Sequence, residues 1–149
     1  MRAKRLKKLS AANSASPKQP EKPTFFVDRQ LGRYKFAGIL RAAGLDVLIH
    51  DDHFAPETID TEWLATAGER GWVVITRDER IRYRAAERET VRRAKVRAFV
   101  LAAHGDLRAE VLADIFLRAL PKVRAILAKE GPPFIAKIWR DGQAALIDF

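Results

Sequence analysis

The chain has 149 residues, a length that suits one domain together with a tail. It contains no cysteine, which excludes disulfide scaffolds, cysteine-ligated zinc sites and cysteine nucleophiles. No apolar run approaches the roughly 20 residues that span a bilayer, and the basic start is not followed by the apolar segment of a secretory signal. We therefore expect a cytoplasmic protein without a membrane-spanning segment.

The formal net charge of +9 is distributed unevenly along the chain. Residues 1–22 contain seven Lys or Arg and a single acid, Glu21, so this stretch carries +6 and the rest of the chain carries +3. Because residues 1–23 are also poor in large apolar side chains and rich in Lys, Ala, Ser and Pro, we expect a basic, disordered tail there and a folded domain over 24–149. The tail is either simply solvated or an arm that binds phosphates.

From Thr24 onward, short apolar runs alternate with segments of helical periodicity. In chain order we expect a strand over 24–28, a helix over 33–43, a strand over 45–49, a helix over 59–70, a strand over 72–76, a helix over 85–94, a strand over 96–101, a helix over 107–127, and strands over 132–139 and 144–149. The last two strands flank Asp141-Gly142, a pair typical of hairpin turns. This alternation predicts βαβ units, a mainly parallel sheet with a C-terminal hairpin, and helices on both faces.

Acidic residues follow three of the predicted strands. Asp28 comes after the first strand, Asp51 and Asp52 come after the second, and Asp78 comes after the third. In a parallel sheet these strand ends share one edge, which is where open α/β sheets bind their ligands. We therefore expect the four carboxylates to lie along a single rim.

Asp60 and Glu62 begin the second predicted helix, which can face the same rim. Carboxylates at close range repel one another unless cations neutralise them, and hard oxygen ligands favour Mg²⁺ or Mn²⁺. Two such ions about 4 Å apart can stabilise the attacking and leaving oxygens of phosphodiester hydrolysis, with a water molecule as nucleophile. A second interpretation stays open, because each acid alone could cap backbone N–H groups, as Asp60 could beside Thr58 and Thr61.

Four segments, taken together and in order, resemble the PIN-like nuclease family, in particular the VapC-type toxins of bacterial toxin–antitoxin modules. They are FFVD (25–28) followed by Leu31-Gly32, HDD (50–52), IDTEWL (59–64) and VVITRDERI (73–81). The resemblance covers residues 24–140. It implies a three-layer α/β/α PIN-like sandwich that hydrolyses RNA with divalent metal held by a cluster of acids.

By this resemblance Asp28, Asp60 and Asp78 are the catalytic residues. Glu62 competes with Asp60 because the family pattern has a glutamate in this helix, and residues two positions apart do not share a helix face. Glu79, directly after the third acid, is a further candidate. The metal ligands that the resemblance implies are Asp28, Asp51, Asp52, Asp60, Glu62 and Asp78, with one of the paired acids completing the site.

Arginines cluster close to the first and third of these strand ends. We interpret four of them as clamps for the RNA backbone, namely Arg29, Arg33, Arg77 and Arg80. The alternative for the later part of this segment is a solvated helix face on which arginines, Arg88 among them, form salt bridges with Glu79, Glu87 and Glu89.

The resulting hypothesis is a metal-dependent endoribonuclease, the toxin of a toxin–antitoxin pair, in which a metal-activated water attacks the RNA phosphodiester. The resemblance further implies a small DNA-binding antitoxin as partner and, as is common in the family, a homodimer. The alternative is a non-catalytic PIN-like module that binds RNA or protein, which the basic tail favours. A nucleotide-binding Rossmann-like protein ranks below both, because residues 28–32 (DRQLG) are no GxGxxG motif.

Overall fold

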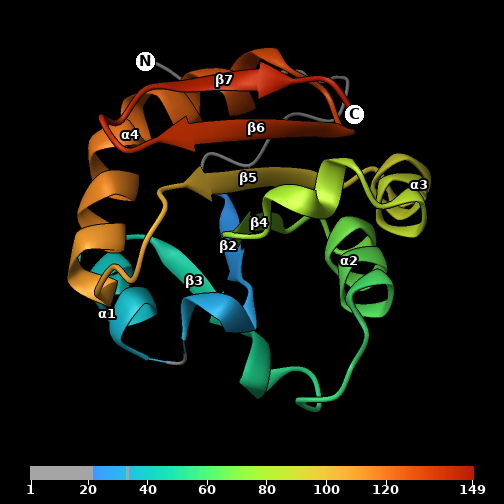
Figure 1. Cartoon of the computed structure of the whole chain (residues 1–149), viewed down its shortest axis with the longest axis horizontal. Helices are drawn as coiled ribbons and strands as arrows, with labels where there is room; N and C mark the ends of the chain where they lie inside the picture. Colours follow the sequence, from blue (N-terminus) through green and yellow to red (C-terminus); the bar gives the residue numbers. More distant parts are fainter. Residues whose placement is uncertain (1–21, 33) are drawn as a thin grey trace, which may run out of the picture.

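The computed structural model describes residues 22–32 and 34–149, and Figure 1 shows how their elements are arranged. The strands are β2 (Thr24–Val27), β3 (Asp46–Ile49), β4 (Val73–Thr76), β5 (Arg97–Ala102), β6 (Phe134–Trp139) and β7 (Ala144–Ile147). The α-helices are α1 (Lys35–Ala42), α2 (Asp60–Glu69), α3 (Ala85–Ala94) and α4 (Ala109–Lys129). Three short 3₁₀ turns follow the first three strands, namely η2 (Arg29–Leu31), η3 (His50–Asp52) and η4 (Glu79–Arg82).

All ten helices and strands expected from the sequence are present, and their ends agree with the expected ones within two residues. The three 3₁₀ turns were not expected. The predicted basic tail lies outside the described residues, except for Lys22 and Pro23, and so does Arg33.

The strands form one sheet in the order β3-β2-β4-β5-β6-β7. Every neighbouring pair is parallel except β6 and β7, which form the antiparallel hairpin at one edge of the sheet in Figure 1. The prediction of a mainly parallel α/β fold with a C-terminal hairpin is confirmed.

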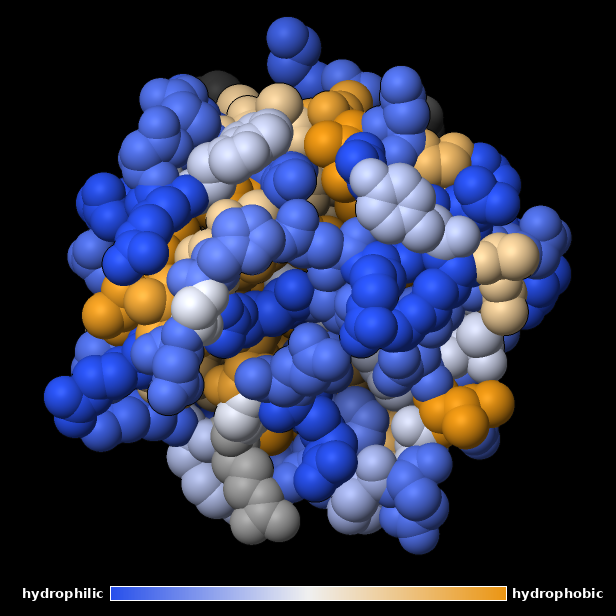
Figure 2. All heavy atoms as spheres, viewed as in Figure 1, coloured by the Kyte–Doolittle hydropathy of each residue, from blue (hydrophilic) through white to orange (hydrophobic). Residues whose placement is uncertain are grey.

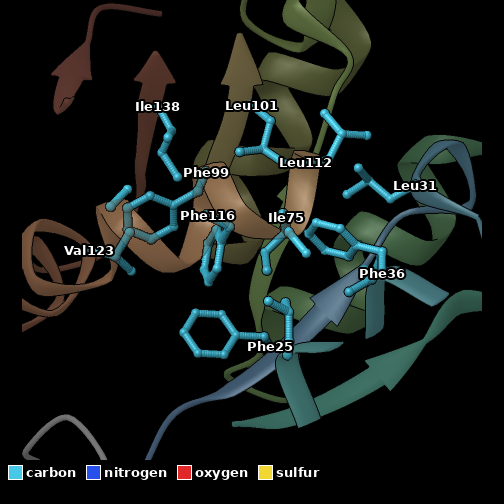
Figure 3. Packing of buried hydrophobic residues seen from close by; sticks show 14 of the residues in the cluster. Phe25, Leu31, Phe36, Ile75, Phe99, Leu101, Leu112, Phe116, Val123 and Ile138 are labelled. Carbon is cyan, nitrogen blue, oxygen red and sulfur yellow. The ribbon is translucent and has the colours of Figure 1, made fainter. Parts of the chain in front are cut away.

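Helices cover both faces of the sheet, α1 and α4 on one face and α2 and α3 on the other (Figure 1). Side chains alternate between the faces along each strand, so Phe25 and Val27 pack toward α1 and α4 whereas Phe26 packs toward α2 and α3. Each face of the sheet has its own hydrophobic core, and Figure 3 shows the core under α1 and α4. In it the rings of Phe25 and Phe116 pack edge to face, with 5.5 Å between the ring centroids. Burial on both faces explains why the central strands are continuous apolar runs in the sequence.

Figure 2 shows one face of the molecule, which is largely hydrophilic with small, separate apolar areas. Among residues 22–32 and 34–149, no helix is both long and apolar enough to pass through a membrane.

The strand order fixes where a ligand can bind. From β2 the chain crosses to β3 on one side and then returns to β4 on the other side of β2, so the direction of winding reverses between β2 and β4. In open α/β sheets this reversal leaves a crevice at the carboxyl ends of the two strands. Asp28 follows the end of β2, and Thr76 is the last residue of β4. Both side chains lie on the face of the sheet that α2 and α3 cover.

Candidate active site

Asp28 lies directly after β2 and is only 7% exposed. Its Oδ2 accepts a hydrogen bond from the Thr76 hydroxyl at 2.7 Å, and its Oδ1 accepts one from the backbone N–H of Gln30 at 3.4 Å. Burial raises the pKa of Asp28 above its ordinary value, the charge of Asp60 raises it further, and the two hydrogen bonds oppose this rise. The fold therefore holds a carboxylate whose negative charge its neighbours compensate incompletely.

The Thr76 hydroxyl connects Asp28 to Asp78. It donates to Asp28 and accepts a hydrogen bond from the backbone N–H of Asp78 at 3.0 Å. Oδ1 of Asp78 caps η4 by accepting from the N–H of Arg80 at 3.0 Å, while its Oδ2 accepts from Nη1 of Arg84 at 2.9 Å. Capping and a place in the site are thus compatible, because the two oxygens of one carboxylate serve different partners.

Two further carboxylates reach the same place from α2 and α3. Asp60 is the first residue of α2, and Glu87 lies in the first turn of α3. One carboxylate oxygen each from Asp60, Asp78 and Glu87 lies within 4.8 Å of the other two. We call these three residues the acidic cluster. Asp28 is outside the acidic cluster, but the charge of Asp60 raises its pKa, and the Thr76 hydroxyl connects it to Asp78 by hydrogen bonds.

Close packing of α2 against α3 brings Asp60 and Glu87 together. At the contact, a Cβ added to Gly68 would lie 2.3 Å from the carbonyl oxygen of Ala94, a distance that no side chain can accept. Glycine at this position therefore permits the close approach of the C-terminal ends of α2 and α3, the two helices whose first turns carry Asp60 and Glu87.

Glu87 is more buried than is usual for a glutamate, with 12% of its side chain exposed. Burial raises its pKa, the hydrogen bond and charge of Arg84 lower it, and the charges of Asp60 and Asp78 raise it again. A buried acid held next to two like charges is typical of functional sites.

Arg84 places one nitrogen among all three carboxylates. Its Nη1 is 2.9 Å from Oδ2 of Asp78, 3.2 Å from Oε2 of Glu87 and 3.9 Å from Oδ2 of Asp60. A single guanidinium thus offsets part of the negative charge of the acidic cluster.

Comparison with known proteins places this chain in a family. Residues 23–103 match the family described as "PIN like domain". The chain belongs to the PIN-like domain family. It is 32% identical over 111 residues to a Mycobacterium tuberculosis protein named "Putative ribonuclease VapC45", and this similarity covers 72% of the chain and 80% of that protein. No solved structure matches this chain. The matched residues include Asp28 and the whole acidic cluster, and the resemblance noted in the sequence is confirmed at the level of the family.

Besides Asp28, three predicted ligands of this PIN-like domain lie outside the acidic cluster, namely Asp51, Asp52 and Glu62. Oδ1 of Asp51 accepts a hydrogen bond from Nε of Arg29 at 3.1 Å, and the side chains of Asp52 and Glu62 are exposed. Strand order explains the first two, because β3 lies on the side of β2 away from β4, about two strand spacings of roughly 4.8 Å from the end of β4. Glu62 faces away because it follows Asp60 by two residues on the same helix.

The arginines predicted to bind RNA divide into different environments. Arg29 binds Asp51 and lies 3.5 Å from the carbonyl oxygen of Pro56, and Arg77 donates to the carbonyls of Ala103 and Gly105, so both hold loops in place. The side chain of Arg80 is 70% exposed and touches Oδ1 of Asp78 through Nε at 3.4 Å.

Glu79, the further candidate, pairs with other residues. Its carboxylate lies 3.2 Å from Nζ of Lys137 and 3.6 Å from Nε2 of His104. Together with Gln30 and Arg77 it lines an open pocket beside the turn that carries Asp78.

The sequence analysis did not name Glu87 as a ligand, and mentioned it only in the alternative of a solvated helix face with salt bridges. The helical repeat contained the relevant information, because Glu87 precedes Val91 by four residues and the two share one side of α3. Val91 packs in the core below α2 and α3, so Glu87 faces inward at the end of the helix.

The donors of the acidic cluster fit a hard divalent cation. Asp60, Asp78 and Glu87 offer carboxylate oxygens from three separate elements within a span that one small ion can bridge. Mg²⁺ and Mn²⁺ both prefer oxygen ligands of this kind.

Proposed function

We propose that this PIN-like domain is a divalent-metal-dependent endoribonuclease and the toxin of a toxin–antitoxin pair. The observation that carries the proposal is the acidic cluster at the point where the winding of the sheet reverses. The similarity to a protein named "Putative ribonuclease VapC45" supports RNA as the substrate.

In this proposal Asp60, Asp78 and Glu87 hold the ion, which is Mg²⁺ or Mn²⁺. When bound, such an ion supplies an activated water for hydrolysis of the phosphodiester and neutralises charge at the phosphate. Asp28 adds its negative charge next to the acidic cluster, and Thr76 holds that carboxylate in place by a short hydrogen bond. Burial is the main cause of the raised pKa values of Asp28 and Glu87, and neighbouring carboxylates add to both rises. A cation bound nearby would stabilise these buried carboxylates in their charged form.

The RNA backbone would pass along the carboxyl edge of the sheet. Arg80 is the exposed arginine next to Asp78, so it can reach a phosphate on the substrate. The open pocket beside Glu79 gives the flanking nucleotides a place at the same edge. Arg77 supports this surface by fixing the loop after β5 through its bonds to Ala103 and Gly105.

The proposal extends to partners. A toxin of this kind requires a cognate antitoxin, which we take to be a small DNA-binding protein that covers the acidic cluster. A homodimer, common in the family, is a further part of the proposal and is tested by the molar mass of the purified chain in solution.

A second candidate, a non-catalytic PIN-like module, is favoured by one observation. Arg84 already neutralises part of the acidic cluster from within the chain, so the site could be held together without any metal. Such a module would bind RNA or a protein, and a chelator would not affect its binding.

The test is cleavage of single-stranded RNA by the purified chain in Mg²⁺ or Mn²⁺. We expect cleavage that stops with EDTA and slows at least about 100-fold in Asp78→Asn, because the loss of one carboxylate weakens charge stabilisation by several kcal/mol. Asp52→Asn is the matched control, since Asp52 is exposed and outside the acidic cluster, and it should cleave like the wild type. Cleavage by Asp78→Asn at the wild-type rate, or cleavage in EDTA, would refute the metal-dependent mechanism. No cleavage by the wild type, together with RNA binding that persists in EDTA, would leave the non-catalytic module.

A further inference from the structure

Arg84 differs from the other arginines near the site in what it contacts. Arg29 and Arg77 donate to backbone carbonyls that hold loops together, and Arg80 reaches only Asp78 among the three acids. Nη1 of Arg84 lies within 4.0 Å of one oxygen from every member of the acidic cluster. Arg84 therefore lies where a cation that bridges Asp60, Asp78 and Glu87 would draw on the same oxygens.

The charges in this region explain why a cation from the chain itself is needed. The acidic cluster has three carboxylates within 4.8 Å of one another, with Asp28 close by, and repulsion at such distances opposes folding. Arg84 supplies one positive charge against three negative ones. The hydrogen bond with Glu87 raises the pKa of Arg84 still further, so its charge persists at every physiological pH.

Arg84 is also able to leave. Its side chain is 36% exposed, and it extends from the short connection between η4 and α3. Its side chain contacts the three carboxylates, and within residues 22–32 and 34–149 no backbone carbonyl anchors it in the way that Ala103 and Gly105 anchor Arg77. Rotation about its side-chain bonds can release the carboxylates without a change in the backbone.

From this geometry we infer that Arg84 is the resident counter-ion of the acidic cluster, and that a divalent cation binds there by displacing it. The inference rests on the metal site of the proposed function. It assigns Arg84 as a positioning residue that keeps the carboxylates together in the metal-free protein and sets a threshold for metal binding. Two consequences follow, one for stability and one for affinity, and they have opposite signs.

Isothermal titration of the full chain with Mn²⁺, without RNA, measures the effect on affinity. We expect Arg84→Gln to bind Mn²⁺ about tenfold more tightly than the wild type, because the ion no longer competes with a guanidinium for the same oxygens. Arg80→Gln is the matched control, since Arg80 belongs to the same segment and touches Asp78 but not Asp60 or Glu87; its affinity should stay within about threefold of the wild type. In thermal melts Arg84→Gln should unfold at a lower temperature without metal and gain more from Mn²⁺ than the wild type does.

A second measurement needs no variant. In the wild type, the side-chain Nε–H resonance of Arg84 should move toward the position of a solvent-exposed arginine as Mg²⁺ saturates the site, while that of Arg77 should stay in place. An Arg84 resonance that is unchanged at saturation would overturn the inference.

The outcomes separate this inference from the proposed function. If the wild type binds Mn²⁺ and Arg84→Gln binds it equally or more weakly, the inference fails while the metal site stands. If neither the wild type nor any variant binds Mn²⁺, the proposed metal site is refuted and the inference is refuted with it. If Arg84→Gln binds more tightly yet no RNA is cleaved, the inference stands and the ribonuclease proposal fails.

Discussion

Thr76 is the side chain on which the link between Asp28 and Asp78 depends, and replacing it with valine removes that link with little change in shape. The residue is 1% exposed, donates to Oδ2 of Asp28 at 2.7 Å and accepts from the N–H of Asp78 at 3.0 Å. Valine leaves the Asp28 carboxylate with one donor fewer and the N–H of Asp78 without this acceptor.

The expected loss in the free energy of unfolding follows from these two bonds. A hydrogen bond to a charged group contributes about 1.5–3 kcal/mol, and a buried donor left without a partner costs about 1–3 kcal/mol. The extra methyl group of valine returns about 0.8 kcal/mol, so we expect a net loss of about 2–5 kcal/mol at neutral pH. The Thr76→Ser control keeps the hydroxyl and loses only a buried methyl group, which costs about 1 kcal/mol.

The loss in Thr76→Val should depend on pH. The hydrogen bond from Thr76 lowers the pKa of Asp28 relative to the value that burial alone would produce. A contribution of this sign stabilises the fold at pH values above the ordinary aspartate pKa and disappears as the pH falls through the pKa of the folded protein, because protonated Asp28 needs the donor less.

Urea unfolding of wild type, Thr76→Val and Thr76→Ser between pH 7.5 and pH 4.5 checks this reasoning. The gap between wild type and Thr76→Val should narrow toward acid pH, and the gap for Thr76→Ser should stay constant. A loss below about 0.5 kcal/mol for Thr76→Val, or a loss that is the same at both pH values, would refute the account of Thr76.

Three other changes test the same site. Asp28→Asn should be at least as stable as the wild type near pH 7. Burial raises the pKa of Asp28, so the free energy of unfolding of the wild type falls as the pH rises through that pKa. In urea unfolding the stability of the variant relative to the wild type should therefore be higher at pH 7.5 than at pH 5, and the variant should not cleave RNA. Gly68→Ala should cost more than about 2 kcal/mol and weaken Mn²⁺ binding because it pushes α2 away from α3, whereas Gly38→Ala, in α1 with open space around it, should be neutral or gain up to about 1 kcal/mol in thermal melts. Glu87→Gln should lower Mn²⁺ affinity at least about tenfold in isothermal titration, because a carboxylate ligand becomes a neutral amide.

Local sequence patterns predicted the elements that carry the site. Alternating apolar runs and helical repeats located β2, α2 and β4, and the acids at their ends, Asp28, Asp60 and Asp78, were identified from those positions. The position of each of these acids is set by a short stretch of sequence around it, in which an apolar run ends or a helix begins.

Features that depend on contacts distant in the sequence were not predictable in the same way. The sequence analysis placed Asp51 and Asp52 on the same rim of strand ends as Asp78. The strand order separates these two acids from Asp78, and no local sequence pattern encodes that order. Glu87 and Arg84 lie in a segment dense in charges of both signs, where composition favours a solvated helix face. Only the packing of α3 on α2 brings them to the acidic cluster.

The most direct test of the account is a crystal structure of the chain with Mn²⁺, with the ion located by its anomalous scattering. We expect a peak bound to carboxylate oxygens of Asp60, Asp78 and Glu87, about 2.2 Å from each, with Arg84 displaced from them. An absence of any peak at saturating Mn²⁺, or a peak at Asp51 and Asp52 with Arg84 still between the three carboxylates, would contradict it.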